Sequence, residues 1–327
     1  MTRPDVARIR EALIAARDIT AARDIRLGNA RPQALRTPTD RRRLDGALTA
    51  GLAKADIDVG QWEAELAKSR TAGRRRLDEL RADAVKQSGS RAEELWAGLE
   101  GQRKGLDLLA GTGQGAGGVQ YLSLDSPFLI WTKPLMGLDE STIEPWKSRA
   151  KFRFERSNPG GSVQLEDIGT EDVSFYFLWD NPGPGWALVT VDGFLVLDGF
   201  STATSHGGYF GGGSAALDLD ASLNILEPGG EPPSLPPLPQ AGQSASVLKL
   251  EAHSSGLFSD DNTQYALVYR GFDLRYELLA VPPSSVLVID VSLSISYDLM
   301  DGSVAADFAT GDFGVICPFV SIQVLAS

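Results

Sequence analysis

The sequence predicts an α-helical segment over residues 1–110, followed by an antiparallel, jelly-roll-like β-sandwich region over residues 119–327. Two observations lead to this division. Residues 1–110 carry 22 Lys/Arg and 17 Asp/Glu and the remainder carries 9 and 26, so a net charge of +5 is followed by one of −17. Among 13 Phe, 7 Tyr and 6 Trp, only Trp62 and Trp96 precede residue 111. A joint change in charge and aromatic content indicates two regions of different architecture.

Residues 1–110 show the helical period. Apolar or small side chains recur at spacings of three and four over residues 6–16, and the Gly-Asn pair at 28–29 predicts a helix end. The period resumes in the forties, with a break expected near residues 56–61. Ser90 and Glu93 form a capping box, in which each side chain accepts the other's free backbone N–H, so a last helix is expected to begin there.

The most regular apolar stripe of this region follows the capping box. Its spacing alternates four and three, with Gln102 at the one polar position. Two interpretations stay open: a small bundle of three or four helices, or a coiled coil that needs a neighbouring subunit. The opposite charges of the two regions also favour docking of a helix onto the acidic region of another copy. The interface candidates are Leu95, Leu99, Leu106 and Leu109.

Residues 111–118 are rich in glycine and contain the spacing Gly113-x-Gly115-x-x-Gly118. This is formally a dinucleotide fingerprint, but a true fingerprint follows a strand and opens a helix. Here a predicted helix precedes it. We therefore interpret residues 111–118 as a flexible hinge.

Beyond the hinge, β-rich runs alternate with turn signals such as Asn-Pro-Gly and Asp-Gly, as a sandwich requires. Residues 289–295 alternate apolar and polar side chains, which predicts one buried and one wet face. Residues 227–244 hold six prolines and are expected to be a linker or long loop. Similar short runs on either side leave two architectures open: two related sandwiches over residues 119–226 and 245–327, or one larger sandwich.

Loops near residues 180–186, 204–213 and 258–264 are candidates for recognition, because loops on a rigid sandwich often carry it. The run 260–262 offers oxygen atoms that suit calcium, but turns favour the same residue types, and no metal site is predicted. Trp186 offers a surface for a sugar ring, although core packing is the expected role for a tryptophan at a strand start. The candidate ligand contacts are Trp186, His206, Tyr209, Phe210, Asp260, Asp261 and Asn262.

The composition of the chain argues against several classes of function. Cys317 is the single cysteine, which excludes an internal disulfide and a multi-cysteine metal site. The serine before His206 shows no orienting acid, so we predict no catalytic residue and no cofactor. Acidic residues interleave with the arginine runs at 41–43 and 74–76, which argues against nucleic-acid binding. No uncharged apolar run reaches the roughly 18 residues of a transmembrane helix.

No motif identifies a family, but the layout of helical segment, hinge and sandwich is similar to that of fibre, spike and adhesin subunits of virions and injection particles. We therefore expect a non-enzymatic subunit that forms a homo-oligomer or joins a larger assembly, anchored by its helices and displaying its β region. The alternative is a carbohydrate- or cell-surface-binding module used in adhesion. A toxin that inserts helices is disfavoured, because residues 1–110 lack a long apolar face. Charges in residues 1–20 predict synthesis in the cytoplasm without a signal peptide, with later release in a particle left open.

Overall fold

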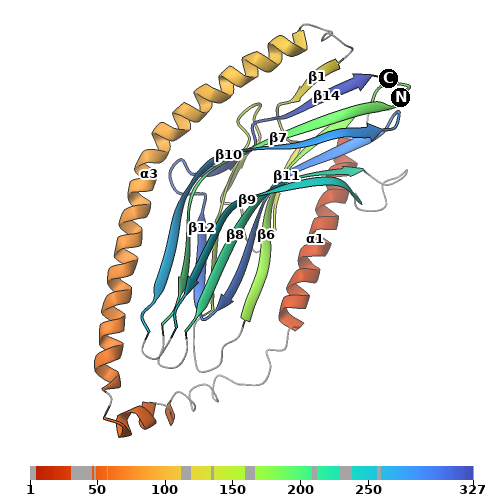
Figure 1. Ribbon diagram of the computed structural model, residues 1–327. Coiled ribbons are helices and arrows are strands. Elements are labelled where there is room, and N and C mark those ends of the chain that lie inside the picture. The colour runs from red at the N-terminus through yellow and green to blue at the C-terminus, as the bar shows by residue number, and fades with distance from the viewer. Residues whose placement is uncertain are drawn as a thin grey trace.

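The computed structural model describes residues 5–30, 46–47, 49–56, 58–111, 119–133, 136–158, 166–207, 212–227, 238–255 and 259–326. Two long helices, α1 (Val6–Ala30) and α3 (Val59–Gly111), flank two antiparallel sheets (Figure 1). Nearly all of the predicted hinge lies outside the described residues. None of the helices in the described ranges is long and apolar enough to cross a membrane.

The two sheets form a β-sandwich. Sheet A has nine strands, ordered β1-β14-β7-β13-β4-β3, with β10 and β12 also paired to β7 and β5 paired to β12. Its strands are β1 (Val119–Leu124), β3 (Glu140–Thr142), β4 (Arg149–Lys151), β5 (Arg153–Asn158), β7 (Ala187–Ser205), β10 (Asn262–Val281), β12 (Gly302–Asp307), β13 (Gly314–Ile316) and β14 (Val320–Ala326). Sheet B has the order β2-β6-β11-β8-β9, with β2 (Leu129–Thr132), β6 (Glu166–Asp180), β8 (Ser214–Glu227), β9 (Leu238–His253) and β11 (Val286–Met300).

Strands from both halves of the β region alternate within each sheet. β7 pairs with β10 along its whole length, and β11 lies between β6 and β8. Residues 119–226 and 245–327 therefore do not form two separate sandwiches, and the topology is that of one larger sandwich. The similar short runs reflect the alternation common to half-buried strands rather than a repeated folding unit.

The proline-rich stretch is shorter than expected. Strand β9 begins at Leu238, so residues 238–244 belong to a strand and not to a linker, while residues 228–237 lie outside the described ranges. Pro239 lies in the edge strand of sheet B, beside the register shift between Ile225 and Leu226, and edge strands and bulges are where a sheet tolerates proline.

The core lies between the sheets, and the alternation of each strand supplies it. Along β7 the residues at odd positions face sheet B, and the even positions face outward. Cys317 is fully buried in the same cluster. The inward side chains with no exposed surface include Val189, Val191, Leu195 and Leu197 of β7, Phe175 and Phe177 of β6, Leu219 and Leu223 of β8, and Ile289 and Leu293 of β11.

Helix α3 runs without interruption through the predicted capping box, so a helix start at Ser90 is wrong. The Ser90 hydroxyl donates to the carbonyl of Gln87 instead. Extending a helix adds one hydrogen bond per residue, whereas a new start requires another nucleus. The break expected near residues 56–61 is confirmed: Asp56 has a φ of 55°, and α3 begins at Val59.

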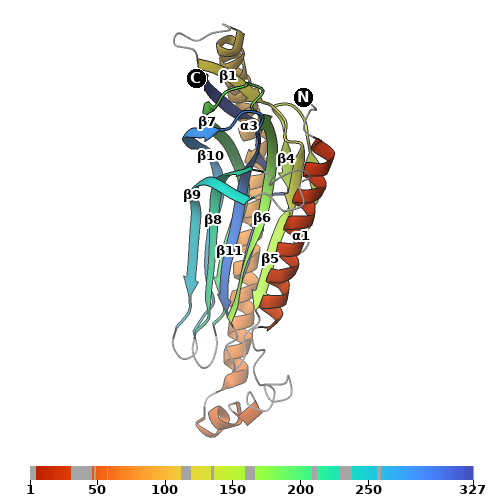
Figure 2. The same ribbon diagram turned by 90° about the vertical axis from the view of Figure 1, so that its right-hand side faces the viewer.

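The helices lie on opposite outer faces of the sandwich (Figure 2). Ile9 and Leu13 of α1 pack in one apolar cluster with Tyr176 of sheet B. Ala84 of α3 packs with Phe200 of sheet A in another. The described helices therefore form neither a bundle nor a coiled coil with each other, because the sheets provide the larger apolar surfaces. The face of β11 that the alternation predicts to be wet is partly covered, and Asp290 and Ser292 on it are buried.

Candidate functional site

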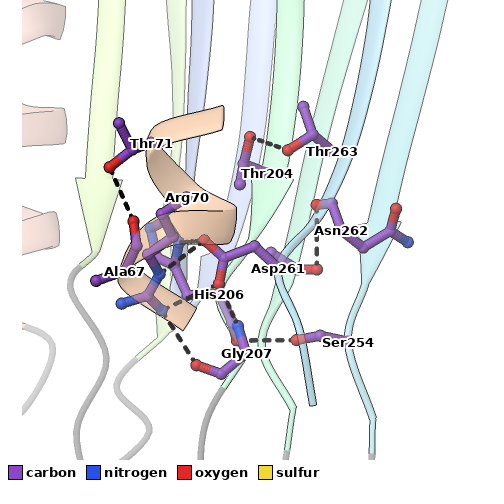
Figure 3. A network of polar contacts seen from close by, with 11 residues as sticks. Ala67, Arg70, Thr71, Thr204, His206, Gly207, Ser254, Asp261, Asn262 and Thr263 are labelled. Atoms are coloured by element: carbon purple, nitrogen blue, oxygen red, sulfur yellow. Dashed lines mark hydrogen bonds and ion pairs between the residues drawn. The ribbon is translucent and has the colours of Figure 1, made fainter. Parts of the chain in front are cut away.

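Two of the residues predicted to contact a ligand, His206 and Asp261, meet helix α3 at one end of sheet A (Figure 3). Arg70 of α3 donates from Nε and Nη2 to the two carboxylate oxygens of Asp261, at 2.9 and 3.0 Å. Its Nη2 also donates to the Gly207 carbonyl at 3.2 Å, and the Gly207 N–H donates to Asp261 at 2.8 Å. Nδ1 of His206 lies 3.5 Å from the same carboxylate. Asp261 is the centre of this cluster.

Three groups favour the ionised form of Asp261. Burial opposes ionisation, but the nearby His206 ring and the hydrogen bonds from Arg70 and the Gly207 N–H outweigh it and hold the pKa of Asp261 well below its ordinary value. A carboxylate that this chain already engages on both oxygens offers little to an added ligand. The cluster anchors α3 to the sandwich.

Asp260 and Asn262, the neighbours of Asp261 in sequence, belong to the same turn. Asn262 donates from Nδ2 to the carbonyl of His253 at 3.0 Å, and Asp260 is exposed. Among the residues that the structure describes, no three metal-ligating side chains lie together. Turn geometry and helix anchoring account for the Asp-Asp-Asn run.

The glycines that border the predicted recognition loop pack against backbone. A Cβ on Gly207 would overlap the carbonyl oxygen of Ser259, and one on Gly212 would overlap that of Ser254. Glycine is needed at both positions by this close approach. Tyr209 and Phe210 lie outside the described residues.

Trp186 lies far from this cluster, at the other end of β7. The 19 residues of β7 separate Trp186 from His206 by roughly 60 Å. Trp186 is 58% exposed, so the expectation that it packs in the core is wrong. At its end of the sheet, the Asn181 side chain donates to the carbonyls of Gly185 and Pro282, both at 3.0 Å. The predicted ligand loops do not form one site.

The leucine stripe of α3 belongs to a helix that is docked on its own sheet. Leu99 is only 4% exposed, and Leu95 and Leu106 are half-buried. Association of two copies through these side chains would require α3 to leave the sandwich, and it stays a prediction. The side chain of Leu109 lies outside the described part of the chain.

Arginine–aspartate pairs connect the middle part of α3 to the sandwich. Besides Arg70, Arg81 pairs with Asp307 and Arg91 pairs with Asp198. The opposite charges of the two regions therefore meet within one chain.

A fourth pair holds α1 on sheet B. Arg17 donates from Nη2 to Asp290 at 2.7 Å and from Nε to the Tyr176 hydroxyl at 2.6 Å. Burial raises the pKa of Asp290 to about 6, although Arg17 lowers it. Burial lowers the pKa of Arg17, but Asp290 and Tyr176 outweigh it, so that pKa is raised. This pair adds a buried ionic contact to the apolar cluster that holds α1 on sheet B.

A groove of about 360 Å3 opens between the C-terminal part of α3 and the outer face of sheet A. This volume lies at the small end of the range for small-molecule sites. The helix wall consists of Gln102, Gly105 and Leu106. The sheet floor consists of Asp192, Phe194, Asp273, Arg275, Phe319 and Ser321.

The floor of the groove is partly aromatic. The rings of Phe194 and Phe319 stack with centroids 5.9 Å apart and planes 14° from parallel. Above them, a Cβ placed on Gly105 would meet no atom within 4 Å, so the space over the helix backbone is open.

The polar side of the groove depends on the register of β7 and β10, which places Asp192 opposite Arg275. Arg275 donates to both oxygens of Asp192, at 2.5 and 3.2 Å. Ser321 and Gln323 of β14 donate to the same carboxylate, at 3.3 and 3.4 Å. Asp192 is therefore neutralised and fully engaged.

The Asp273 carboxylate, which lies opposite Phe194 in the register of β7 and β10, has fewer partners than that of Asp192. Neither the Asp273 carboxylate nor the Gln102 amide makes a hydrogen bond to any residue in the described ranges. Burial raises the pKa of Asp273, the nearby Asp192 raises it further, and Arg275 opposes both. The groove thus offers one carboxylate and one amide to a ligand.

Sequence reasoning missed most of this groove and included only Leu106. Residues 186–200 read as one β-rich run, and β7 continues through the Asp192-Gly193 pair inside it. Gly193 faces the core, where a Cβ would come within 2.9 Å of Val291 Cγ2, so close sheet packing and not a turn explains the glycine. The outward alternation of Asp192 and Phe194 was the available signal.

Comparison with known protein families finds no match, and comparison with curated proteins finds none either. Similar solved structures include the module TmCBM61, determined with β-1,4-galactotriose, which is 8% identical with a TM-score of 0.18 over 55% of this chain and 90% of that one. The CBM22-1 xylan-binding domain of Xyn10C from Paenibacillus barcinonensis is 11% identical, with a TM-score of 0.17 over 57% and 93%. The enzymatically active domain of tailspike protein 4 from bacteriophage CBA120 is 9% identical, with a TM-score of 0.17 over 65% and 20%. Likenesses this weak carry no conclusion about what this chain binds.

Proposed function

We propose that this chain is a glycan-binding β-sandwich protein whose ligand occupies the groove between α3 and sheet A. One observation carries the proposal: an aromatic floor lies beside two polar side chains, Asp273 and Gln102, that make no hydrogen bond to the described part of the chain. A sugar ring has a C–H face that packs on an aromatic ring and hydroxyls that bind carboxylates and amides. Such a combination of apolar surface and a few placed polar groups is typical of small-molecule sites.

The charges of the groove favour a neutral sugar. Arg275 is committed to Asp192, and Asp273 adds a carboxylate without a direct partner. An acidic sugar would place like charge beside Asp273, which disfavours it. Neutral oligosaccharides are therefore the first ligands to test.

We propose binding without hydrolysis. Glycoside hydrolysis uses two carboxyl groups, one of which acts as nucleophile or base. In this groove Asp192 accepts hydrogen bonds from Arg275, Ser321 and Gln323, which stabilise it as a structural anion. Oligosaccharides incubated with the protein should be recovered intact.

The test uses a substitution that fills the groove from the helix side. A Cβ at Gly105 meets no atom within 4 Å, and Gly105→Phe replaces a glycine inside a helix, so the helix should be kept while the ring enters the groove. Gly101→Phe is the matched control, because Gly101 also has open space but does not line the groove. Wild type, both variants and Asp273→Asn are titrated calorimetrically with cello-, manno-, xylo- and galacto-oligosaccharides.

The expected result is that at least one series binds wild type and Gly101→Phe equally, while Gly105→Phe abolishes binding. Asp273→Asn should weaken it by roughly three- to tenfold, the scale of one ordinary hydrogen bond, because the amide removes the charge but keeps one acceptor oxygen. If none of the four series binds wild type, or if Gly105→Phe binds as well as wild type does, the groove is not a glycan site.

Self-association is a second candidate function. On the outward face of β10, Tyr265, Leu267 and Tyr269 are each more than 40% exposed, and exposed apolar groups of this kind often mark protein interfaces. Within the described residues β10 pairs only with β7. Sedimentation of wild type and Leu267→Asp tests this candidate: an oligomer that dissociates in the variant supports it, and a wild-type monomer at micromolar concentration rejects it.

A further inference from the structure

The outward side chains of β7 form a continuous strip from the groove to the end of sheet A. Phe194 and Asp192 line the groove, and Thr190 and Leu188 follow on the same face, because alternate residues of a strand share a face. Trp186 precedes the strand and continues this alternation. Leu188 is 43% exposed and Trp186 is 58% exposed. From Phe194 to Trp186 the strip spans about 26 Å.

A β-bulge extends the strip toward β10. The register between β7 and β10 shifts between Tyr276 and Leu279, and Leu278 in the bulge has a φ of 57°. A left-handed backbone is unusual for leucine, and here it goes with a side chain that is 60% exposed. The Leu278 N–H donates to the Thr190 hydroxyl at 3.4 Å. The bulge therefore presents an apolar side chain beside the middle of the strip.

On the other flank, β14 contributes polar groups. Ser321 and Gln323 lie opposite Asp192 and Thr190 in register and share their face. Along the strip the surface is apolar at Phe194, polar at Asp192, Arg275 and Thr190, and apolar again at Leu278, Leu188 and Trp186. The centre of a protein interface is usually depleted of charge. This strip instead carries the Asp192–Arg275 ion pair between its apolar parts.

We propose that the strip from the groove to Trp186 binds consecutive residues of one extended neutral glycan chain. The ligand class is then an oligo- or polysaccharide, held at one end by the groove and at the other by Trp186, rather than a single terminal sugar. A chain of pyranose rings presents C–H faces and hydroxyls in alternation, as the strip does. This inference rests on the proposed glycan function of the groove.

The experiment measures affinity against chain length. The oligosaccharide series that the wild-type protein binds is titrated, from disaccharide to hexasaccharide, into wild type, Trp186→Ala and Leu188→Ser. Tyr265→Ala is the matched control, because it removes an exposed aromatic ring from sheet A outside the strip. Thermal unfolding of each variant checks the fold, and Leu188→Ser replaces Trp186→Ala if the latter does not fold.

Wild-type affinity should rise with chain length and then level off. Trp186→Ala should lose roughly three- to tenfold for the longest chain and nothing for the disaccharide, and Tyr265→Ala should lose nothing. A loss that is equal at all lengths, or absent at all lengths, overturns the extended site while the groove stands. A change of oligomeric state in Trp186→Ala, with unchanged binding, makes the strip a protein interface and also overturns it. Failure of the proposed function itself is recognised separately, by the absence of a Gly105→Phe effect on the disaccharide.

Discussion

Arg91 of α3 donates from Nη2 to Oδ1 of Asp198 at 2.8 Å, and the two side chains are only 12% and 4% exposed. The guanidinium also lies over the ring of Tyr269, 5.2 Å from its centroid, and donates to the carbonyl of Ala84. Burial raises the pKa of Asp198, while its hydrogen bond with Arg91 lowers it. This pair joins the middle of α3 to the middle of sheet A, so we expect the docking of α3 on the sheet to depend on it.

Arg91→Ala should destabilise the protein by about 3–5 kcal/mol, because it leaves the buried Asp198 carboxylate without its partner. The measurement is urea unfolding followed by circular dichroism at neutral pH. Arg75→Ala is the control: Arg75 is 83% exposed and, among the described residues, pairs with Glu79 of the same helix. Similar losses in the two variants would show that the Arg91 pair does not hold α3.

The free energy of unfolding should rise as the pH falls from 7 toward 5. The folded-state pKa of Asp290 is raised to about 6, above the ordinary value of a carboxyl group in an unfolded chain. Between these two values the folded protein binds the proton more tightly, so stability is lost as the pH rises through this window, by up to about 3 kcal/mol. Asp290→Asn should reduce this slope, while the raised pKa values of Glu171, Asp198, Asp218 and Asp273 leave a remainder; an unchanged slope in the variant would show that Asp290 does not contribute.

Below pH 4 the direction should reverse. The pKa values of Asp261 and Asp307 are lowered in the folded state, by hydrogen bonds that outweigh burial. Their stabilisation is present above the ordinary carboxyl pKa and is lost as the pH falls. Equilibrium unfolding between pH 2 and 4 should show Asp261→Asn losing less stability on acidification than wild type does.

The sequence was sufficient to predict strands and helices, because periodicity is local. The alternation along residues 289–295 correctly gave the inner face of β11, and the four-three spacing correctly gave the buried side of α3 at Leu99. The surface on which α3 docks was not predictable in the same way, because its contacts are distant in sequence. Asp198, the partner of Arg91, lies more than a hundred residues further along the chain. The opposite net charges of the helical region and the β region indicated that the two attract each other, but not that this attraction acts within one chain.

The groove was harder to predict for the same reason. Asp192 and Arg275 meet only through the register of β7 and β10, and the single bulge near Leu278 determines which side chains face Thr190 and Trp186. Neither register nor bulge can be derived from spacing within one strand. Asp261 shows the complementary case: its oxygen atoms make it a candidate ligand contact in the sequence, and in the fold those oxygens serve Arg70.

Leu99→Ala should cost about 2–5 kcal/mol, as expected for a large side chain removed from a packed site. Leu108→Ala makes the same chemical change on the same helix, but Leu108 is 72% exposed, so little stability should be lost. Chemical denaturation of the two variants compares them directly. Equal effects would mean that the C-terminal part of α3 is not docked as described.

Two glycines of α3 should be replaceable at a gain in stability. Gly101 and Gly105 have helical backbones and open space where a methyl group would lie, so alanine at either should stabilise the protein by about 0.5–1 kcal/mol. Only Gly105 lines the groove, however, so Gly105→Ala should also change oligosaccharide affinity, while Gly101→Ala should not. A glycine retained at a stability cost beside a binding groove is the expected trade between stability and function. Melting curves and titrations of both variants decide it: equal gains in stability with a binding change confined to Gly105→Ala support the groove, and identical binding in the two variants removes this reason for the glycine.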